Sequence, residues 1–192
     1  DMDESFVMNR PFGFDASGSK GETAQQVGET ADNPAVVEAD GQVTAQKNVA
    51  LGMFAADCLP VLMADAEAGV IGAAHCGRRG LQNGVIGATV EKMVAKGAKP
   101  ERIVATLGPC ICGDCYEVGG DIADEFDAQF PGTFTLSRFG QPGIDIAAAA
   151  LQELAKAGVP ADNVVSSTPP VHPTTQYLSD DKKLAETCQS AR

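Results

Sequence analysis

Two apolar runs joined by a short polar turn constrain the fold of this 192-residue chain more than any other stretch. The runs are residues 61–64 and 70–74, and residues 65–69 separate them. Strand-like runs on either side of a glycine-containing turn predict a β-hairpin. If the turn centres near residue 67, Cys58 and His75 are almost equidistant from it, and we expect them to face each other with Cβ atoms roughly 5 Å apart.

Further periodic segments lie on both sides of the hairpin along the chain. Residues 49–54 form a continuous apolar run typical of a strand buried on both faces. Residues 81–98 have the apolar stripe of a helix, formed by Leu81, Val85, Ile86, Thr89, Val90, Met93 and Val94. Residues 103–107 and 164–165 predict two more strands. Residues 120–130 predict a helix with Ile122, Phe126 and Phe130 inward, and residues 144–157 predict an Ala-rich helix.

The first 48 residues have a different character, because Gly, Ser, Asp and Gln dominate between residues 12 and 41. Short apolar pieces at residues 6–8 and 35–37 predict loops around one or two edge strands. Strands and helices are mixed and the hairpin requires antiparallel pairing. We therefore expect an α/β or α+β sandwich with a mixed β-sheet and flanking helices. At this length, residues 1–192 are expected to form a single domain.

Charge and composition exclude several classes of function. The formal net charge of −12 argues against nonspecific binding to nucleic acid or to an anionic membrane. No run approaches the roughly 18 apolar residues of a membrane span. Six cysteines are too few to indicate a disulfide scaffold in a chain of this size, so a reducing cytoplasm is the expected compartment.

Cys58 and His75 are the principal candidates for chemistry. Taken singly, a free cysteine is usually a buried structural residue and a lone histidine usually belongs to the core. Their symmetrical placement about the turn favours function. The pair fits either a thiolate–imidazolium couple or two ligands of a zinc ion.

The segment Gly77-Arg78-Arg79-Gly80 lies between the second hairpin strand and the expected helix. Glycines allow a ligand to approach the backbone, and a helix N-terminus favours an anion. Arg78 and Arg79 add guanidinium groups that fork onto phosphate or carboxylate oxygens. A solvated turn is the alternative for these four residues taken alone, and their position directly after His75 favours an anion site.

A second cysteine cluster, formed by Cys110, Cys112 and Cys115, superficially resembles a metal knuckle. A structural zinc site needs a second ligand pair, and no such pair occurs at a matching distance. We therefore predict a turn whose small, mostly buried thiols pack under Tyr116, rather than a zinc or iron–sulfur site.

Three motifs in order identify a resemblance. Residues 56–62 read ADCLPVL, residues 74–81 read AHCGRRGL, and Leu107-Gly108-Pro109 precedes residues 115–119, which read CYEVG. These segments strongly resemble the YfiH-like laccase-domain family, whose members are also called polyphenol oxidases or purine nucleoside phosphorylases. The resemblance is specific from about residue 38 to residue 159.

This resemblance implies an α/β sandwich with a zinc-capable site of one cysteine and two histidines. Cys58 and His75 match two of the ligands. The third belongs to an earlier Gln-Val-His-Gly-like segment, for which residues 8–13 are the nearest candidate, with Phe12 at the histidine position. Residues 26–28 are a rival alignment that also lacks histidine. Arg79 matches the family arginine, and Arg78 stands where the family has tryptophan.

The implied activity is phosphorolysis of adenosine- or inosine-type nucleosides, with a nucleoside and phosphate as the small-molecule partners. Arg79, with Arg78, Gly77 and Gly80, would hold phosphate, while Cys58 and His75 would position ribose or transfer a proton. One alternative is a cysteine hydrolase or deamidase with Cys58 as nucleophile and His75 as base. Another is a degenerate binding protein, motivated by Phe12. Copper-dependent phenol oxidation is disfavoured, because one cysteine and two histidines cannot build several copper sites.

Overall fold

The computed structural model describes residues 6–7 and 39–166. Their main feature is a six-stranded mixed sheet with strand order β1-β2-β4-β3-β5-β8. Only the last pair is parallel, and the other four neighbouring pairs are antiparallel. The strands are β1 (Phe6–Val7), β2 (Gly41–Thr44), β3 (Leu59–Asp65), β4 (Val70–Cys76), β5 (Val104–Leu107) and β8 (Val164–Ser166).

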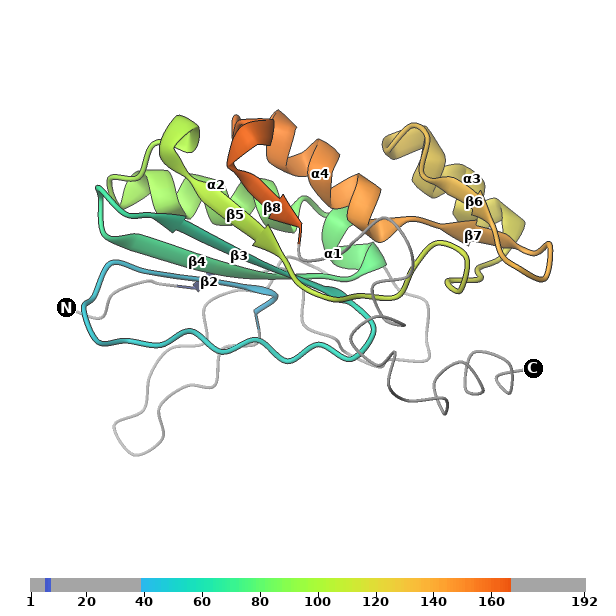
Figure 1. Cartoon of the computed structure of the whole chain (residues 1–192), viewed down its shortest axis with the longest axis horizontal. Helices are drawn as coiled ribbons and strands as arrows, with labels where there is room; N and C mark the ends of the chain where they lie inside the picture. Colours follow the sequence, from blue (N-terminus) through green and yellow to red (C-terminus); the bar gives the residue numbers. More distant parts are fainter. Residues whose placement is uncertain (1–5, 8–38, 167–192) are drawn as a thin grey trace, which may run out of the picture.

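Helices cover one face of this sheet, as Figure 1 shows for α2 and α4. The α-helices are α1 (Arg78–Gln82), α2 (Val85–Ala95), α3 (Gly120–Gln129) and α4 (Ile146–Lys156). Short 3-10 turns, η1 (Pro100–Arg102) and η2 (Ala161–Asn163), precede β5 and β8. A small hairpin of β6 (Phe134–Leu136) and β7 (Pro142–Ile144) lies beside α3. The predicted class, a mixed sheet with flanking helices, is confirmed.

The two faces of the β3–β4 hairpin have different surroundings. Leu59, Val61 and Met63 on β3 are buried and belong to the main core. Gly72 lies opposite Met63 on β4, and a Cβ at Gly72 would come within 2.8 Å of the Met93 sulfur on α2, so this face packs on the helix. The alternate residues point away from the helices, and Leu62 among them is 52% exposed.

The predicted strand at residues 49–54 is wrong. These residues are irregular in the structure, and Phe54 is 98% exposed. The reason lies in the topology, because β2 pairs directly with β4, and β3 is enclosed by β4 and β5. No inner position of the sheet remains for this run. The apolar piece at residues 6–8 corresponds to the edge strand β1, and the piece at residues 35–37 lies outside the described residues. The short strand β2 was not predicted, and it lies inside the sheet between β1 and β4.

Helix boundaries also differ from the prediction. The expected helix over residues 81–98 is two helices, because Gly84 adopts a left-handed conformation (φ 76°) between α1 and α2. Val94 is 42% exposed, although the other predicted stripe residues are buried. On α3, Ile122 is 37% exposed, and Ala123 takes its place beside Phe126 in the core.

The last long helix begins later than expected. Residues 142–144 form β7, and the carboxylate of Asp145 then caps α4 by accepting a hydrogen bond from the Ala148 amide (2.9 Å). The strands predicted over residues 103–107 and 164–165 correspond to β5 and β8 and are confirmed.

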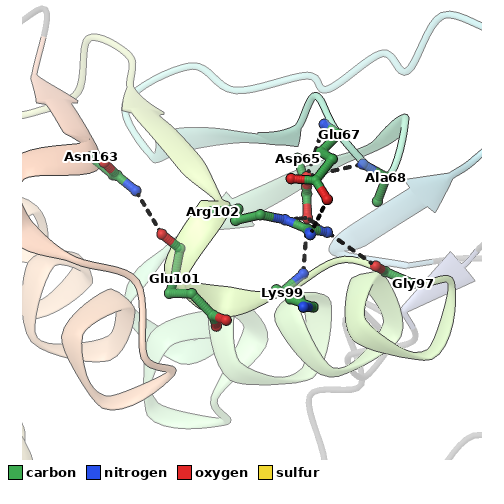
Figure 2. Close-up of polar contacts among 8 residues, drawn as sticks. All are labelled: Asp65, Glu67, Ala68, Gly97, Lys99, Glu101, Arg102 and Asn163. Carbon is green, nitrogen blue, oxygen red and sulfur yellow. Dashed lines mark hydrogen bonds and ion pairs between the residues drawn. The ribbon is translucent and has the colours of Figure 1, made fainter.

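An ion-pair network fixes the closed end of the hairpin (Figure 2). The buried Asp65 carboxylate accepts hydrogen bonds from the Glu67 and Ala68 amides of the turn, at 3.0 and 3.1 Å. It also accepts from the Lys99 amide (2.9 Å) and from the Arg102 guanidinium (2.7 Å). The hydrogen bond from Arg102 is the main cause that holds the pKa of Asp65 well below its usual value. The network therefore ties the turn to the segment between α2 and β5.

Within residues 39–166, no helix combines the length and the apolar character needed to span a membrane.

Candidate functional site

The open end of the β3–β4 hairpin brings Cys58 and His75 together in a diagonal arrangement. The register pairs Leu59 with Cys76 and Pro60 with His75. Continued by one residue, it places Cys58 opposite Gly77, two positions beyond His75 on the same face. The predicted direct opposition is therefore wrong by one diagonal step, because it needs a turn centred between residues 66 and 67, and the four-residue turn 66–69 centres one residue later.

Gly77 supplies the space in which the two side chains meet. A Cβ at this position would lie 3.0 Å from the Cys58 sulfur and 3.8 Å from the Cε1 carbon of His75. Glycine therefore leaves a gap that the thiol occupies beside the imidazole. Cys58 and His75 are both half-buried, so the pair is reachable from solvent at the face opposite the helices.

Asp40 is the third member of this arrangement. Its Oδ1 lies 3.0 Å from Nδ1 of His75, and its backbone carbonyl accepts a hydrogen bond from the His75 amide (2.7 Å). Asp40 directly precedes β2, which pairs with β4, so the sheet positions the carboxylate beside the imidazole. The His75 side chain also forms a hydrogen bond with Cys58.

The electrostatics of His75 follow from these contacts. The hydrogen bond to Asp40, followed by the hydrogen bond to Cys58, raises the pKa of His75 to about 9, against an opposing effect of burial. His75 is therefore predominantly an imidazolium at neutral pH. A cationic imidazole between a carboxylate and a thiol is suited to donating a proton or to stabilising an anion.

The four residues after Cys76 differ in exposure. Gly80 is buried, and a Cβ there would approach the His75 carbonyl oxygen to 3.0 Å, so glycine lets α1 pack closely on β4. Arg78 is half-buried and donates a hydrogen bond to the Gln82 side chain (2.7 Å), whereas Arg79 is exposed. Because α1 has only five residues, the arginine side chains rather than a helix dipole provide the positive charge.

The segment after β5 forms another wall of the site. The Ile111 amide donates a hydrogen bond to the Asp57 carbonyl (2.9 Å), which fixes this segment next to Cys58. Burial raises the pKa of Tyr116, and the Cys58 charge adds to that rise while Arg78 opposes it. Tyr116 therefore shares the surroundings of both groups. Of the predicted cysteine cluster, Cys110 is buried while Cys112 and Cys115 are half-buried.

The donor set does not fit a complete metal site within residues 6–7 and 39–166. No group of three or more His, Cys, Asp or Glu side chains there is arranged to hold an ion. Cys58 and His75 provide two of the donors that zinc prefers, fewer than the three protein ligands of a catalytic zinc site. The segments considered for the third ligand, including Phe12, lie outside the described residues.

Comparison with known proteins decides the family. Residues 18–179 match the family described as multi-copper polyphenol oxidoreductase laccase. The chain belongs to this family. A solved structure in the same fold is the hypothetical protein YfiH of Bacillus licheniformis, which is 26% identical with a TM-score of 0.63. The similarity covers 72% of this chain and 53% of YfiH, and it confirms the predicted YfiH-like resemblance.

Curated relatives carry two different enzyme names. "Purine nucleoside phosphorylase ORF3" of Streptomyces griseus is 48% identical over 132 residues, which are 69% of this chain and 52% of that protein. "Adenosine deaminase RL5", from an unidentified prokaryote, is 39% identical over 132 residues, which are 67% of this chain and 50% of that protein. The chain thus spans about half the length of these relatives.

The sequence did not reveal that Asp40 contacts His75 or that Tyr116 lies near Cys58. Asp40 was visible only as part of the resemblance that begins near residue 38, and nothing in its local pattern indicated a partner 35 positions away. A carboxylate just before a short strand is a weak signal, and only the pairing of β2 with β4 gives it meaning.

Proposed function

We propose that this protein cleaves purine nucleosides by phosphorolysis and that the residues around His75 handle the proton and the phosphate. The observation that carries the proposal is the series of contacts from Asp40 through His75 to Cys58. Arg78 and Arg79 follow His75 closely in the sequence and bring positive charge to the same end of the hairpin. Family membership and the printed name of the Streptomyces griseus relative support the choice of a nucleoside as substrate.

In this reaction a phosphate oxygen attacks C1′ of the ribose while the bond from C1′ to the purine nitrogen breaks. The products are the free base and ribose 1-phosphate. The departing purine needs a proton or a positive charge to stabilise its developing anion. The pKa of His75, raised to about 9, keeps the imidazole protonated at neutral pH, and the contact with Asp40 orients the ring, so His75 is assigned to supply this proton.

Arg79 is exposed beside the pair and is assigned to the phosphate, with Arg78 as its neighbour. A guanidinium binds two phosphate oxygens at once and neutralises part of their charge. Gly77 and Gly80 contribute by letting the backbone of α1 lie close to Cys58 and His75. Cys58 would contact the ribose and keep the imidazole in place.

The test is incubation of the purified chain with adenosine or inosine, with and without phosphate, followed by chromatography of the products. We expect free base and ribose 1-phosphate, formed only when phosphate is present. Replacing His75 by Gln should lower kcat by about 10²–10⁴-fold, the usual contribution of a positioned acid. Arg79→Met should raise the KM for phosphate, and Lys92→Met, at an exposed cation on α2, is the matched control.

A phosphate-independent reaction would contradict this proposal. So would base release that persists unchanged in both Cys58→Ala and His75→Gln proteins whose circular dichroism matches the parent.

Hydrolytic deamination of adenosine is a second candidate. It is supported by the printed name of the RL5 relative and by the pairing of a thiol with an imidazole, which also suits a cysteine hydrolase. The same incubation separates the two reactions, because deamination yields inosine and ammonia without phosphate. Saturable nucleoside binding with no product of either kind would instead favour the degenerate binding protein.

A further inference from the structure

We propose that Cys112 and Cys115 form a thiol–disulfide exchange site whose substrate is a low-molecular-weight disulfide. The proposed function leaves these two residues unused. They are the ends of a Cys-x-x-Cys turn, Cys112-Gly113-Asp114-Cys115, and neither of them forms a disulfide in the structure.

The backbone of the turn brings the two residues within bonding range. The Cys115 amide donates a hydrogen bond to the Cys112 carbonyl (2.9 Å), and the Tyr116 amide donates to the same oxygen (3.0 Å). A turn closed by such a bond has its first and fourth Cα atoms less than about 7 Å apart. Disulfides form across Cα separations of about 4.4–6.8 Å, so the two sulfurs can join with little backbone movement.

The β6–β7 hairpin holds this turn in place. Thr135 donates a hydrogen bond from its hydroxyl to the Gly113 carbonyl (2.9 Å), and a Cβ at Gly113 would come within 2.8 Å of the Thr135 methyl group. The Arg138 amide donates to the Asp114 carbonyl (3.2 Å). The turn is therefore fixed by a neighbouring element, which lowers the entropic cost of joining its ends.

A contact from Arg138 assigns the attacking role to Cys115. The Arg138 guanidinium donates a hydrogen bond to the Cys115 sulfur, with an Nη2–Sγ distance of 2.8 Å. A guanidinium in contact with a sulfur favours the thiolate, which is the nucleophile in exchange. Cys112 and Cys115 are half-buried, so a small disulfide reaches them, whereas Cys110 beside them is buried and burial raises its pKa.

The exchange proceeds in two steps. The Cys115 thiolate attacks one sulfur of a disulfide RSSR, which breaks the S–S bond, releases one RS⁻ and leaves a mixed disulfide on Cys115. Cys112 then loses its proton and attacks the Cys115 sulfur, which releases the second RS⁻. In sum, two protein thiols lose two protons and two electrons, and RSSR is reduced to two thiols.

The test uses the full chain, reacted with glutathione disulfide over a range of ratios to glutathione. The reaction is quenched with iodoacetamide and the protein is digested with trypsin. Fragment 103–138 contains Cys110, Cys112 and Cys115, so mass spectrometry reports on this cluster separately from the other cysteines. We expect the mass of fragment 103–138 to show one internal disulfide, which makes it lighter than the reduced fragment by two hydrogen atoms. The same disulfide should form in a Cys110→Ala variant.

Single variants test the assignment of roles. In Cys112→Ser the reaction should stop at a mixed disulfide on Cys115. That mixed disulfide should form at least about tenfold faster than the one on Cys112 in the Cys115→Ser variant. Arg138→Gln should remove most of this difference, whereas Lys92→Met, a cation remote from the turn, should leave it unchanged.

The proposal is overturned if no internal disulfide forms at any glutathione ratio. It is equally overturned if the disulfide disappears with Cys110→Ala, or if Cys112 and Cys115 react at equal rates in their single variants. None of these results depends on nucleoside cleavage, so they leave the phosphorolysis proposal independent of this one.

Discussion

Replacement of Asp40 by Asn should lower the pKa of His75. Asp40 is the largest cause of the rise to about 9, through the 3.0 Å contact between its Oδ1 and Nδ1 of His75. Asn keeps the size and an oxygen acceptor but removes the negative charge. We expect the pKa of His75 to fall by about one unit or more toward its ordinary value near 6.5, equivalent to about 1.4 kcal/mol of lost preference for the imidazolium.

The same change should alter how stability depends on pH. Between pH 6.5 and 9, folded His75 keeps a proton that the unfolded chain has lost. The folded state then binds more protons, so the free energy of unfolding falls as pH rises through this window, by at most about 1.4 kcal/mol per pH unit for one group. The stabilisation is fully present below pH 6.5. In Asp40→Asn the decline should be shallower and should end at lower pH.

Two-dimensional NMR of the imidazole nitrogens, recorded with a chelator present, measures the pKa directly. The chain has two histidines, so a His172→Gln variant assigns the His75 signals. Urea unfolding at several pH values measures the linkage. A His75 midpoint below pH 7 in the parent, or one unchanged by Asp40→Asn, would refute the reasoning that Asp40 holds the imidazolium.

Three further substitutions test the packing of the site and of the fold. Gly77→Ala should push the thiol of Cys58 away from the imidazole, because the new Cβ would lie 3.0 Å from its sulfur, and should lower the midpoint of the His75 NMR titration. An unchanged midpoint would count against the assigned contact. Asp145→Ala should cost about 1 kcal/mol of unfolding free energy in urea by removing the cap of α4, and Asp145→Asn should restore most of it. Phe126→Ala should cost about 3–5 kcal/mol by opening a cavity in the core. The control Leu151→Ala, at a 45% exposed position of α4, should change stability by less than about 0.5 kcal/mol, and equal losses would contradict the assigned burial.

The hairpin was predictable because its signal is local. An apolar run, a polar turn with glycine and a second apolar run specify antiparallel pairing between neighbours in the chain. This pairing alone places Cys58 and His75 close together, independently of the rest of the fold. The residue after the turn at which pairing begins was not predictable. The turn centre lies one residue later than direct opposition of Cys58 and His75 requires, and this shift makes their contact diagonal.

Residues 49–54 show why a composition signal can fail. An apolar run becomes a buried strand only if a strand of the sheet has an unpaired side next to which it can lie. Here the side of β4 away from β3 is already paired with β2. The break at Gly84 has a similar origin, since the apolar stripe continues through it while the backbone turns. Both corrections depend on which distant segments pair, and a window of neighbouring residues does not contain that information.

By itself, the sequence determined the mixed architecture, the hairpin, the cysteine–histidine pair and the arginines that follow it, because each rests on spacing within one segment. Only the tertiary structure decided that Asp40 reaches His75, that Gly77 provides the gap for the thiol, and that Arg138 contacts Cys115. The physical reason is that these contacts join residues 19 to 35 positions apart in the chain. Their geometry is set by strand pairing and packing rather than by local preference.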